Sequence, residues 1–386
     1  MSTVRIAIAG AGFAGLAAAR QLTRLARSGA EVHLFDRQAF TTMLPALPDV
    51  AGGRILPEHL CEDIARLVSP AVHVHAEAVQ TVNLHQQALT TANGAAFAYD
   101  YLLLATGAVA DTRGLRQNQH QAHTLATIED ARKIRQDFAA FAQARSQPTA
   151  VIVGGGYTGL ELAGNLKILA NRHGRDARVL VVEMKDTILT GLPEKIRSYL
   201  EEQARRQGID TITGARVETF DGANAVLSNG ARLEDVFLCW STGTRRGLPE
   251  LTGDQEELPD GRILVDDFLR IPSHPRAFVA GDAAAITAGG APLRKAVNFA
   301  CYSGQTAARN IRRAVAGAPP RPFRPLDLGW VIPFGQTAAG QVLGINFIKG
   351  RLPLAMHYAM CGYRHYGLRH RLRFAGVAVR ALFGRL

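Results

Sequence analysis

The fold is decided by the stretch Val151-Ile-Val-Gly-Gly-Gly-Tyr-Thr-Gly-Leu-Glu161. Three β-branched residues lead into Gly154, Gly156 and Gly159 at G-x-G-x-x-G spacing, and apolar residues then recur at helical intervals. This order predicts a strand, a tight turn and a helix whose exposed amide N–H groups suit a pyrophosphate. The next strand, Ala177–Glu183, ends in an acid at the place where a ribose hydroxyl would lie.

The same pattern occurs a second time, at the start of the chain. Val4–Gly10 is a short β-branched and alanine-rich run, Gly12 and Gly15 complete the glycine spacing, and Glu31–Asp36 is the matching second strand. One such unit implies one dinucleotide, so two units imply two dinucleotides. Nicotinamide and flavin are the usual pair, and hydride transfer between them is chemistry that the cofactors carry.

Two further strands extend the repeat. Tyr101–Gly107 and Val236–Gly243 are both apolar runs typical of a buried strand, and both end in Thr-Gly. Each is expected to be the last strand of its dinucleotide unit. The predicted fold is α/β, with two Rossmann-like dinucleotide-binding domains followed by a C-terminal amphipathic helical segment that anchors the protein to a membrane. The expected boundaries are 1–110 with 246–325 for the first, discontinuous domain, 111–245 for the second, and 326–386 for the tail.

The remaining elements are read from periodicity. Asp130–Ala144 predicts an amphipathic helix, and residues 72–76 with Thr81–Leu89 predict a small antiparallel sheet. Ala277–Asp282 is expected to be the last strand of the first domain, with its Asp opening a helix.

Three histidines fall on the predicted antiparallel sheet, namely His73, His75 and His85. No carboxylate or cysteine lies near them at ligand spacing, so they are interpreted as surface residues and no metal is expected. The four cysteines are scattered along the chain without C-x-x-C spacing, which favours reduced thiols in a cytosolic setting.

The positive charge of the chain is concentrated at its C-terminal end. The formal net charge is +11, and residues 328–386 contain eight Lys and Arg but no Asp or Glu, so +8 of it lies there. Such a segment suits an anionic membrane or a nucleic acid. It lacks a nucleic-acid motif, and no nucleic-acid partner is expected. The basic residues are Lys349, Arg351, Arg364, Arg369, Arg371, Arg373, Arg380 and Arg385.

The tail is predicted to lie on a membrane rather than to cross one. Residues 328–348 carry no charge, but glycines and Pro333 interrupt them, which favours strand, turn and strand. Two predicted helices follow, each with an apolar stripe on one face and His or Arg residues on the other. Such a pattern is typical of helices that lie in a membrane interface. The alternative is a terminal helix packed on the protein body or on the partner in a homodimer. The stripes are Leu352, Ala355, Met356, Ala359, Met360 and Tyr363, then Leu368, Leu372, Ala375, Val379 and Leu382.

In this order the motifs resemble those of the two-dinucleotide-binding-domain flavoproteins, and most closely the type II NADH dehydrogenases, over almost the whole chain. The resemblance implies FAD and NADH as cofactors. The residues it assigns to FAD are Gly10, Gly12, Ala14, Gly15, Asp36, Arg37, Pro45, Thr106, Gly107, Gly281 and Asp282. The residues it assigns to NADH are Gly154, Gly156, Thr158, Gly159, Glu183, Thr242 and Gly243.

The resemblance also implies a catalytic role for Glu161, which in the family lies near the place where nicotinamide meets flavin. A carboxylate at a helix start is equally explained by the helix dipole. The family's quinone-side helix commonly reads Ala-Gln-x-Ala-x-Gln, whereas this chain has Val297-Asn-Phe-Ala-Cys-Tyr302. The related apoptosis-inducing-factor-like quinone reductases also lack those glutamines. The candidate quinone residues are Val297, Asn298, Cys301 and Tyr302.

The expected activity is transfer of hydride from NADH to FAD and of two electrons to a lipid quinone, by a peripheral enzyme on the cytoplasmic face of the membrane. A disulfide reductase is excluded because residues 40–54 contain no cysteine. A sulfide:quinone oxidoreductase needs paired redox cysteines, and Cys301 lacks a visible partner in the sequence. The alternatives that remain are a reductase of a soluble electron carrier and a flavin-bound sensor or nucleic-acid-binding protein.

Overall fold

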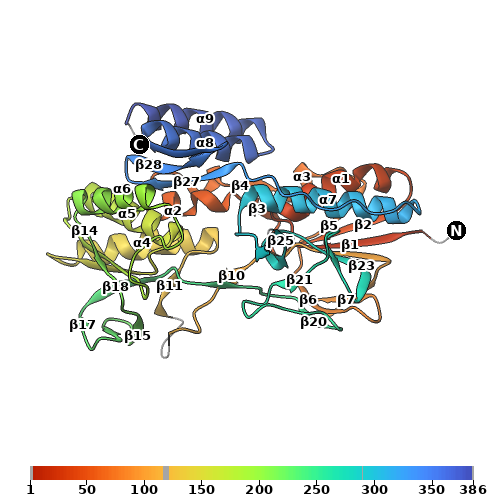
Figure 1. Ribbon diagram of the computed structural model, residues 1–386, viewed down its shortest axis with the longest axis horizontal. Helices are drawn as coiled ribbons and strands as arrows, with labels where there is room; N and C mark the ends of the chain where they lie inside the picture. The colour runs from red at the N-terminus through yellow and green to blue at the C-terminus, as the bar shows by residue number, and fades with distance from the viewer. Residues whose placement is uncertain (1–2, 116–120, 289, 385–386) are drawn as a thin grey trace. The chain divides into compact units, whose positions relative to one another are not determined.

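The computed structural model describes residues 3–115, 121–288 and 290–384 (Figure 1). Arg385, one of the basic residues of the tail, lies outside these ranges. The chain divides into two compact units. The first unit comprises Met1–Thr41, Glu62–Val109 and Thr244–Asp327, and the second comprises Thr42–Cys61, Ala110–Gly243 and Leu328–Leu386.

The first unit is built on a six-stranded sheet with the order β22-β23-β9-β1-β2-β5. All neighbours pair in parallel except β22 with β23, and the predicted strands at the chain start are confirmed. Helices α1 (Phe13–Arg27) and α7 (Val297–Val315) pack against each other in this unit. The strands are β1 (Arg5–Ala9), β2 (Glu31–Phe35), β5 (Val72–His75), β9 (Tyr101–Leu104), β22 (Arg270–Ile271) and β23 (His274–Val279).

A smaller sheet of the first unit has the order β20-β6-β7-β8. Its strands are β20 (Glu250–Thr252), β6 (Val79–Asn83), β7 (Ala88–Thr91) and β8 (Ala96–Ala98), and β6, β7 and β8 pair antiparallel as predicted. The prediction was wrong for Val72–His75, because this strand pairs in parallel with β2 at the edge of the large sheet. Alternation of apolar and polar residues marks a half-buried strand but does not tell which neighbour it pairs with.

The second unit repeats the design with a five-stranded parallel sheet of order β11-β18-β12-β13-β14. The helices that accompany it are α2 (Leu47–Ala51), α4 (Ile128–Gln143), α5 (Tyr157–Arg172) and α6 (Glu194–Arg206). The predicted helix around Asp130 is confirmed and begins two residues earlier, because Thr127 and Asp130 form a capping box. The strands are β11 (His123–Thr124), β12 (Thr149–Val153), β13 (Arg178–Val182), β14 (Ile209–Ile212) and β18 (Val236–Trp240).

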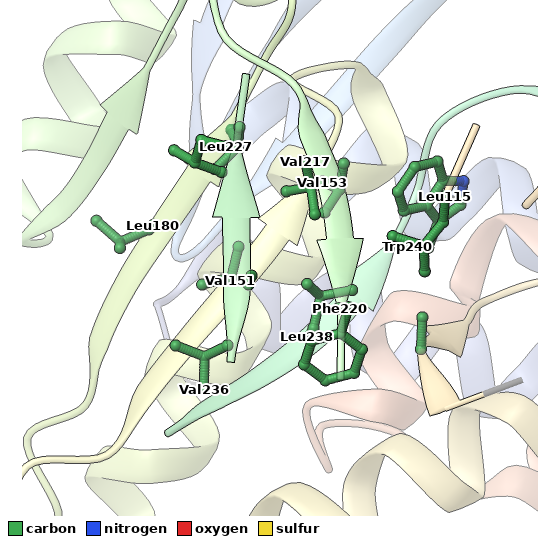
Figure 2. Close-up of a cluster of buried hydrophobic side chains, with 13 residues drawn as sticks. Leu115, Val151, Val153, Leu180, Val217, Phe220, Leu227, Val236, Leu238 and Trp240 are labelled. Carbon is green, nitrogen blue, oxygen red and sulfur yellow. The ribbon is translucent and has the colours of Figure 1, made fainter. Parts of the chain in front are cut away.

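The core of the second unit lies between this sheet and a small antiparallel one formed by β15 (Val217–Phe220), β16 (Ala225–Leu227) and β17 (Arg232–Leu233). Figure 2 shows side chains of both sheets meeting there, with Leu238 beside Phe220 and Trp240 beside Leu115. All of them are buried, and the indole Nε1 of Trp240 donates to the carbonyl of Asp111 at 2.9 Å. Apolar burial on this scale is the main force that holds the unit together.

The tail belongs to the second unit rather than forming a separate domain. It contains three antiparallel strands, β27 (Gly329–Phe334), β28 (Thr337–Val342) and β29 (Ile345–Gly350), where the sequence predicts two. The Tyr199 hydroxyl of α6 lies 2.6 Å from Thr337 Oγ1 of β28. The segment Thr42–Cys61 also joins the second unit, although it falls inside the predicted first domain.

Two helices, α8 (Arg351–Arg364) and α9 (Leu368–Leu382), pack against each other at the end of the chain. They bury Leu354, Tyr358, Cys361 and Phe374, and most of the two predicted apolar stripes is left exposed. Leu368 and Leu372 are 69% and 65% exposed, respectively. Within the described ranges, no helix has the length and apolarity needed to cross a membrane.

Candidate functional site

The first glycine loop connects β1 to α1 in a conformation that other residues do not fit. Gly10 has a φ of +98°, and a Cβ there would lie 2.4 Å from the carbonyl oxygen of Ala105. A Cβ on Gly15 would lie 1.8 Å from the carbonyl oxygen of Gly10. Gly12 faces open space, and α1 has no acidic residue in its first turn. The first N–H groups of a helix have no partner within the helix, so the start of α1 suits an anion such as a pyrophosphate.

The second glycine loop, between β12 and α5, has the same geometry. Gly154 has a φ of +108° and lies so close to Thr242 that a Cβ would meet its Cγ2 at 2.6 Å. A Cβ on Gly159 would lie 2.0 Å from the carbonyl oxygen of Gly154, whereas Gly156 again faces open space. Thr158 in the first turn of α5 is exposed. Thr106 and Thr242 occupy equivalent places, since each Thr-Gly pair follows the strand that closes its loop.

The acids that end the second strand of each unit hold their own glycine loops. Asp36 accepts the backbone N–H of Ala11 at 2.7 Å, and Glu183 accepts that of Gly155 at 2.8 Å. The second oxygen of Asp36 accepts from Gln38, and that of Glu183 accepts from Lys185. A carboxylate oxygen has a second lone pair, so both acids remain able to accept from a ribose hydroxyl. The sequence pattern indicates the ribose role but not this structural one.

The remaining predicted FAD residues lie at the ends of strands or in loops. Thr106 and Gly107 follow β9, Arg37 is exposed next to Asp36, and Pro45 lies in the 3₁₀ helix Leu44–Ala46 of the second unit. Nothing in these positions by itself selects flavin over another nucleotide.

Asp282 follows β23 and lies at the start of a helix as predicted, but this helix is short. It belongs to a 3₁₀ helix, Gly281–Ala283, and α7 begins only at Val297. The N–H of Gly281 donates to Ser303 Oγ of α7 at 3.0 Å. Burial raises the pKa of the Asp282 carboxyl, while the charges of Lys295 and Arg262 lower it. These two basic residues line a small pocket together with Asp282, so groups of both charges meet there.

The four candidate quinone residues lie in the first turns of α7, and two of them are buried. Asn298 is 8% exposed, and its Nδ2 donates to the carbonyl of Leu326 at 2.9 Å. Cys301 is 5% exposed, and no disulfide forms among the four cysteines. Val297 and Tyr302 are the partly exposed members of the set.

A buried polar cluster in the second unit was not predicted from the sequence. The hydroxyl of Tyr358 on α8 donates to Asp49 Oδ1 on α2 at 2.8 Å, and both residues are almost fully buried. Arg54 lies with Nη1 3.6 Å from the same oxygen. The three guanidinium nitrogens of Arg54 are buried and have no hydrogen-bond partner among the described residues.

Glu161 of α5 belongs to the same cluster. Burial raises the pKa of its carboxyl well above the usual range, and the charge of Asp49 raises it further. His357 of α8 is also part of the cluster, and burial lowers its pKa. Glu161 was a candidate residue from the sequence, but its neighbours in the cluster were not. They are an acid within the apolar run Leu44–Ala51 and a tyrosine within an apolar helix, and neither identifies the other as its partner.

Known proteins resemble this chain in sequence or in fold. An NADH dehydrogenase-like protein of Mycobacterium tuberculosis is 29% identical over 301 residues, which cover 73% of each chain. A type II NADH:quinone oxidoreductase of Staphylococcus haemolyticus is 25% identical over 370 residues and 90% of each chain. The solved structure of NDH2 from Plasmodium falciparum in complex with NADH superposes with a TM-score of 0.84 at 15% identity, covering 100% of this chain and 99% of the other.

The match to a family model agrees with the two glycine loops. The model described as pyridine nucleotide-disulphide oxidoreductase matches residues 4–316, a range that contains both loops and both acids. The chain belongs to the pyridine nucleotide-disulphide oxidoreductase family.

Proposed function

We propose that this protein is an FAD-dependent NADH:quinone oxidoreductase. The observation that carries the proposal is the presence of two glycine loops of the same geometry, each held by an acid, in a chain with type II NADH:quinone oxidoreductases among its relatives. When bound, NADH and FAD supply the hydride transfer and the delivery of two electrons to the quinone.

The chain supplies binding and orientation. The open N-termini of α1 and α5, next to Gly12 and Gly156, bind the pyrophosphates of FAD and NADH, respectively. Asp36 and Glu183 accept from ribose hydroxyls while keeping their loops in place. A carboxylate at position 183 repels a 2′-phosphate, so the protein prefers NADH to NADPH.

Glu161 has the properties of a proton donor. Reduction of a quinone to a quinol consumes two protons, and a carboxyl whose pKa is raised holds a proton on its oxygen at a higher pH than an ordinary glutamate does. Its place in the second turn of α5, the helix that follows the proposed NADH loop, is consistent with this role. Val297 and Tyr302 are retained as the accessible members of the predicted acceptor site.

The tail is proposed to hold the protein on the surface of an anionic membrane. Apolar side chains of α8 and α9 are exposed, and the segment has eight basic and no acidic residues. Exposed apolar groups next to arginines suit the boundary between lipid head groups and acyl chains, and anionic lipids are enriched in the cytoplasmic leaflet. This surface favours a lipid quinone over a soluble carrier as the acceptor.

The activity is tested anaerobically on the purified flavoprotein. NADH should bleach the flavin absorbance, and a short-chain quinone should restore it within the mixing time of a stopped-flow experiment. Bleaching without recovery on quinone would refute the quinone as acceptor and direct the search to soluble electron carriers. If NADH fails to bleach the flavin, the assignment of the second glycine loop is wrong.

Membrane binding is tested by co-sedimentation with vesicles that contain phosphatidylserine. The double variant Leu368→Gln/Leu372→Gln should bind at least roughly tenfold more weakly, because it removes two exposed apolar side chains of α9. Leu248→Gln alters an exposed leucine outside the tail and is the matched control, which should bind like the wild type. Equal binding by both variants would refute the membrane proposal.

A further inference from the structure

A group of two histidines and one aspartate lies in the first unit, on segments other than the glycine loop of that unit. The ligand atoms of His85, Asp254 and His274 all lie within 4.8 Å of one another. His85 Nε2 is 3.7 Å from Asp254 Oδ2, and the two imidazole rings meet edge to face with their centroids 5.1 Å apart. In the sequence His85 has no carboxylate at ligand spacing, but the fold brings one to it.

The three residues are held by backbone contacts rather than by chance proximity. His85 follows β6, which pairs with β20, and the N–H of Leu84 donates to the carbonyl of Thr252 just before Asp254. Ser273 Oγ donates to the carbonyl of Asp254 at 2.8 Å, so the residue before His274 is tied to the same segment. The N–H of Asp254 donates to His274 Nε2 at a long 3.3 Å. Three segments that are distant in sequence therefore present their side chains to one point.

The group faces a hollow with room for a bound ion and its water. All three residues line a pocket of about 350 Å³, together with Gln87, Tyr99 and Arg276. The side chains of His85 and Asp254 are 52% and 77% exposed, so an ion reaches them directly. Zinc bonds of about 2.0–2.2 Å in tetrahedral geometry place ligand atoms roughly 3.4 Å apart, close to the 3.7 Å between His85 and Asp254.

We propose that His85, Asp254 and His274 form a binding site for a divalent transition metal of the zinc type, with water in the remaining coordination position. Two imidazoles and one carboxylate suit Zn²⁺, whereas Mg²⁺ and Ca²⁺ prefer sets made of oxygen atoms. Metal binding at His274 Nε2 replaces its long hydrogen bond to Asp254. The ion joins three segments of the first unit and binds only when they are assembled, so it stabilises the folded state.

The site is tested by equilibrium dialysis of the chelator-treated, flavin-loaded full chain against ZnCl₂. The wild type should bind one equivalent of zinc, and His85→Ala should bind zinc at least about tenfold more weakly. Loss of a residue that only supports a metal ligand already lowers metal affinity by about this factor, and loss of a ligand should lower it at least as much. Asp254→Asn should behave in the same way. Zinc should raise the melting temperature of the wild type but not of His85→Ala, and MgCl₂ should change neither.

The matched control is His73→Ala. His73 lies in a second histidine group on β2 and β5, with His33 and His75, whose rings stack at 5.0–5.2 Å around His33. The His73 variant should keep the zinc equivalent and the rise in melting temperature. Equal zinc binding by the wild type and His85→Ala, or loss of the equivalent in His73→Ala, would overturn the proposal. Co²⁺ gives a second readout, since its tetrahedral absorption bands should appear in the wild type and be absent from His85→Ala.

Discussion

Tyr358→Phe isolates one hydroxyl group that joins the tail to the rest of the second unit. Its bond to Asp49 is 2.8 Å long, both side chains are buried, and the partners are 309 residues apart in sequence. A hydrogen bond to a charged group contributes about 1.5–3 kcal/mol, and its loss leaves the buried carboxyl group of Asp49 with the ion pair to Arg54 but without this donor. We therefore expect Tyr358→Phe to lower the free energy of unfolding of this unit by about 2 kcal/mol.

The assay follows from the position of the tryptophans. The chain has two, Trp240 and Trp330, and both belong to the second unit, so tryptophan fluorescence during urea unfolding reports on that unit alone. The matched control is Tyr363→Phe on the same helix, where the side chain is 68% exposed. That variant should stay within about 0.5 kcal/mol of the wild type.

A double-mutant cycle separates the hydrogen bond from other effects of each change. Asp49→Asn removes the acceptor charge and also leaves Arg54 without its ion pair, so it should cost about 3 kcal/mol or more. In that background, Tyr358→Phe should cost less than about 1 kcal/mol, because the charged bond is already lost. Additive effects of the two changes would refute the reasoning and show that Asp49 and Tyr358 act independently.

Three further outcomes are expected. Gly156→Ala should keep the melting temperature, since the new Cβ meets no atom within 4 Å. It should raise the KM for NADH, because the methyl group lies where the pyrophosphate is proposed to bind, and an unchanged KM would contradict that placement. Glu183→Gln should lower the NADH-to-NADPH ratio of kcat/KM by about tenfold through loss of a charge-assisted hydrogen bond, and a constant ratio would exclude the ribose role. The free energy of unfolding of the wild type should fall as pH rises from the ordinary glutamate pKa of about 4.3 towards the raised pKa of Glu161, because the folded state binds one more proton than the unfolded state in that range. Glu161→Gln should remove this dependence on pH. Identical pH profiles of urea unfolding for the wild type and the variant would argue against a raised pKa of Glu161.

The local motifs predicted much of the candidate site. Both glycine loops, the acids Asp36 and Glu183 and the two Thr-Gly turns lie where their spacing indicates. Each is decided within a few residues, because a tight turn into a helix has steric demands that only glycine meets at Gly10 and Gly154. The same spacing did not reveal that the acids also hold the loops, since this depends on the side-chain rotamer in the folded chain.

Where hydrophobic periodicity was the only signal, the sequence predicted whether a segment is a helix or a strand better than it predicted which other elements that segment packs against. Val72–His75 is a strand as expected, but it belongs to the parallel sheet. The apolar stripes of the tail helices are present, but α8 and α9 pack through other residues and leave most of the stripes exposed. A helix with apolar residues on more than one side offers two faces for packing, and the pattern does not say which one the protein body covers.

The sequence by itself determined that this chain forms two dinucleotide-binding units and belongs to a family of flavin and nicotinamide enzymes, because strand, turn, helix and terminal acid are local in the chain. Only the tertiary structure decided the buried pair of Asp49 and Tyr358, the raised pKa of Glu161 and the group of His85, Asp254 and His274. Each of these depends on residues brought together from distant segments. The position of such partners is set by packing of whole elements, which no spacing along the chain encodes.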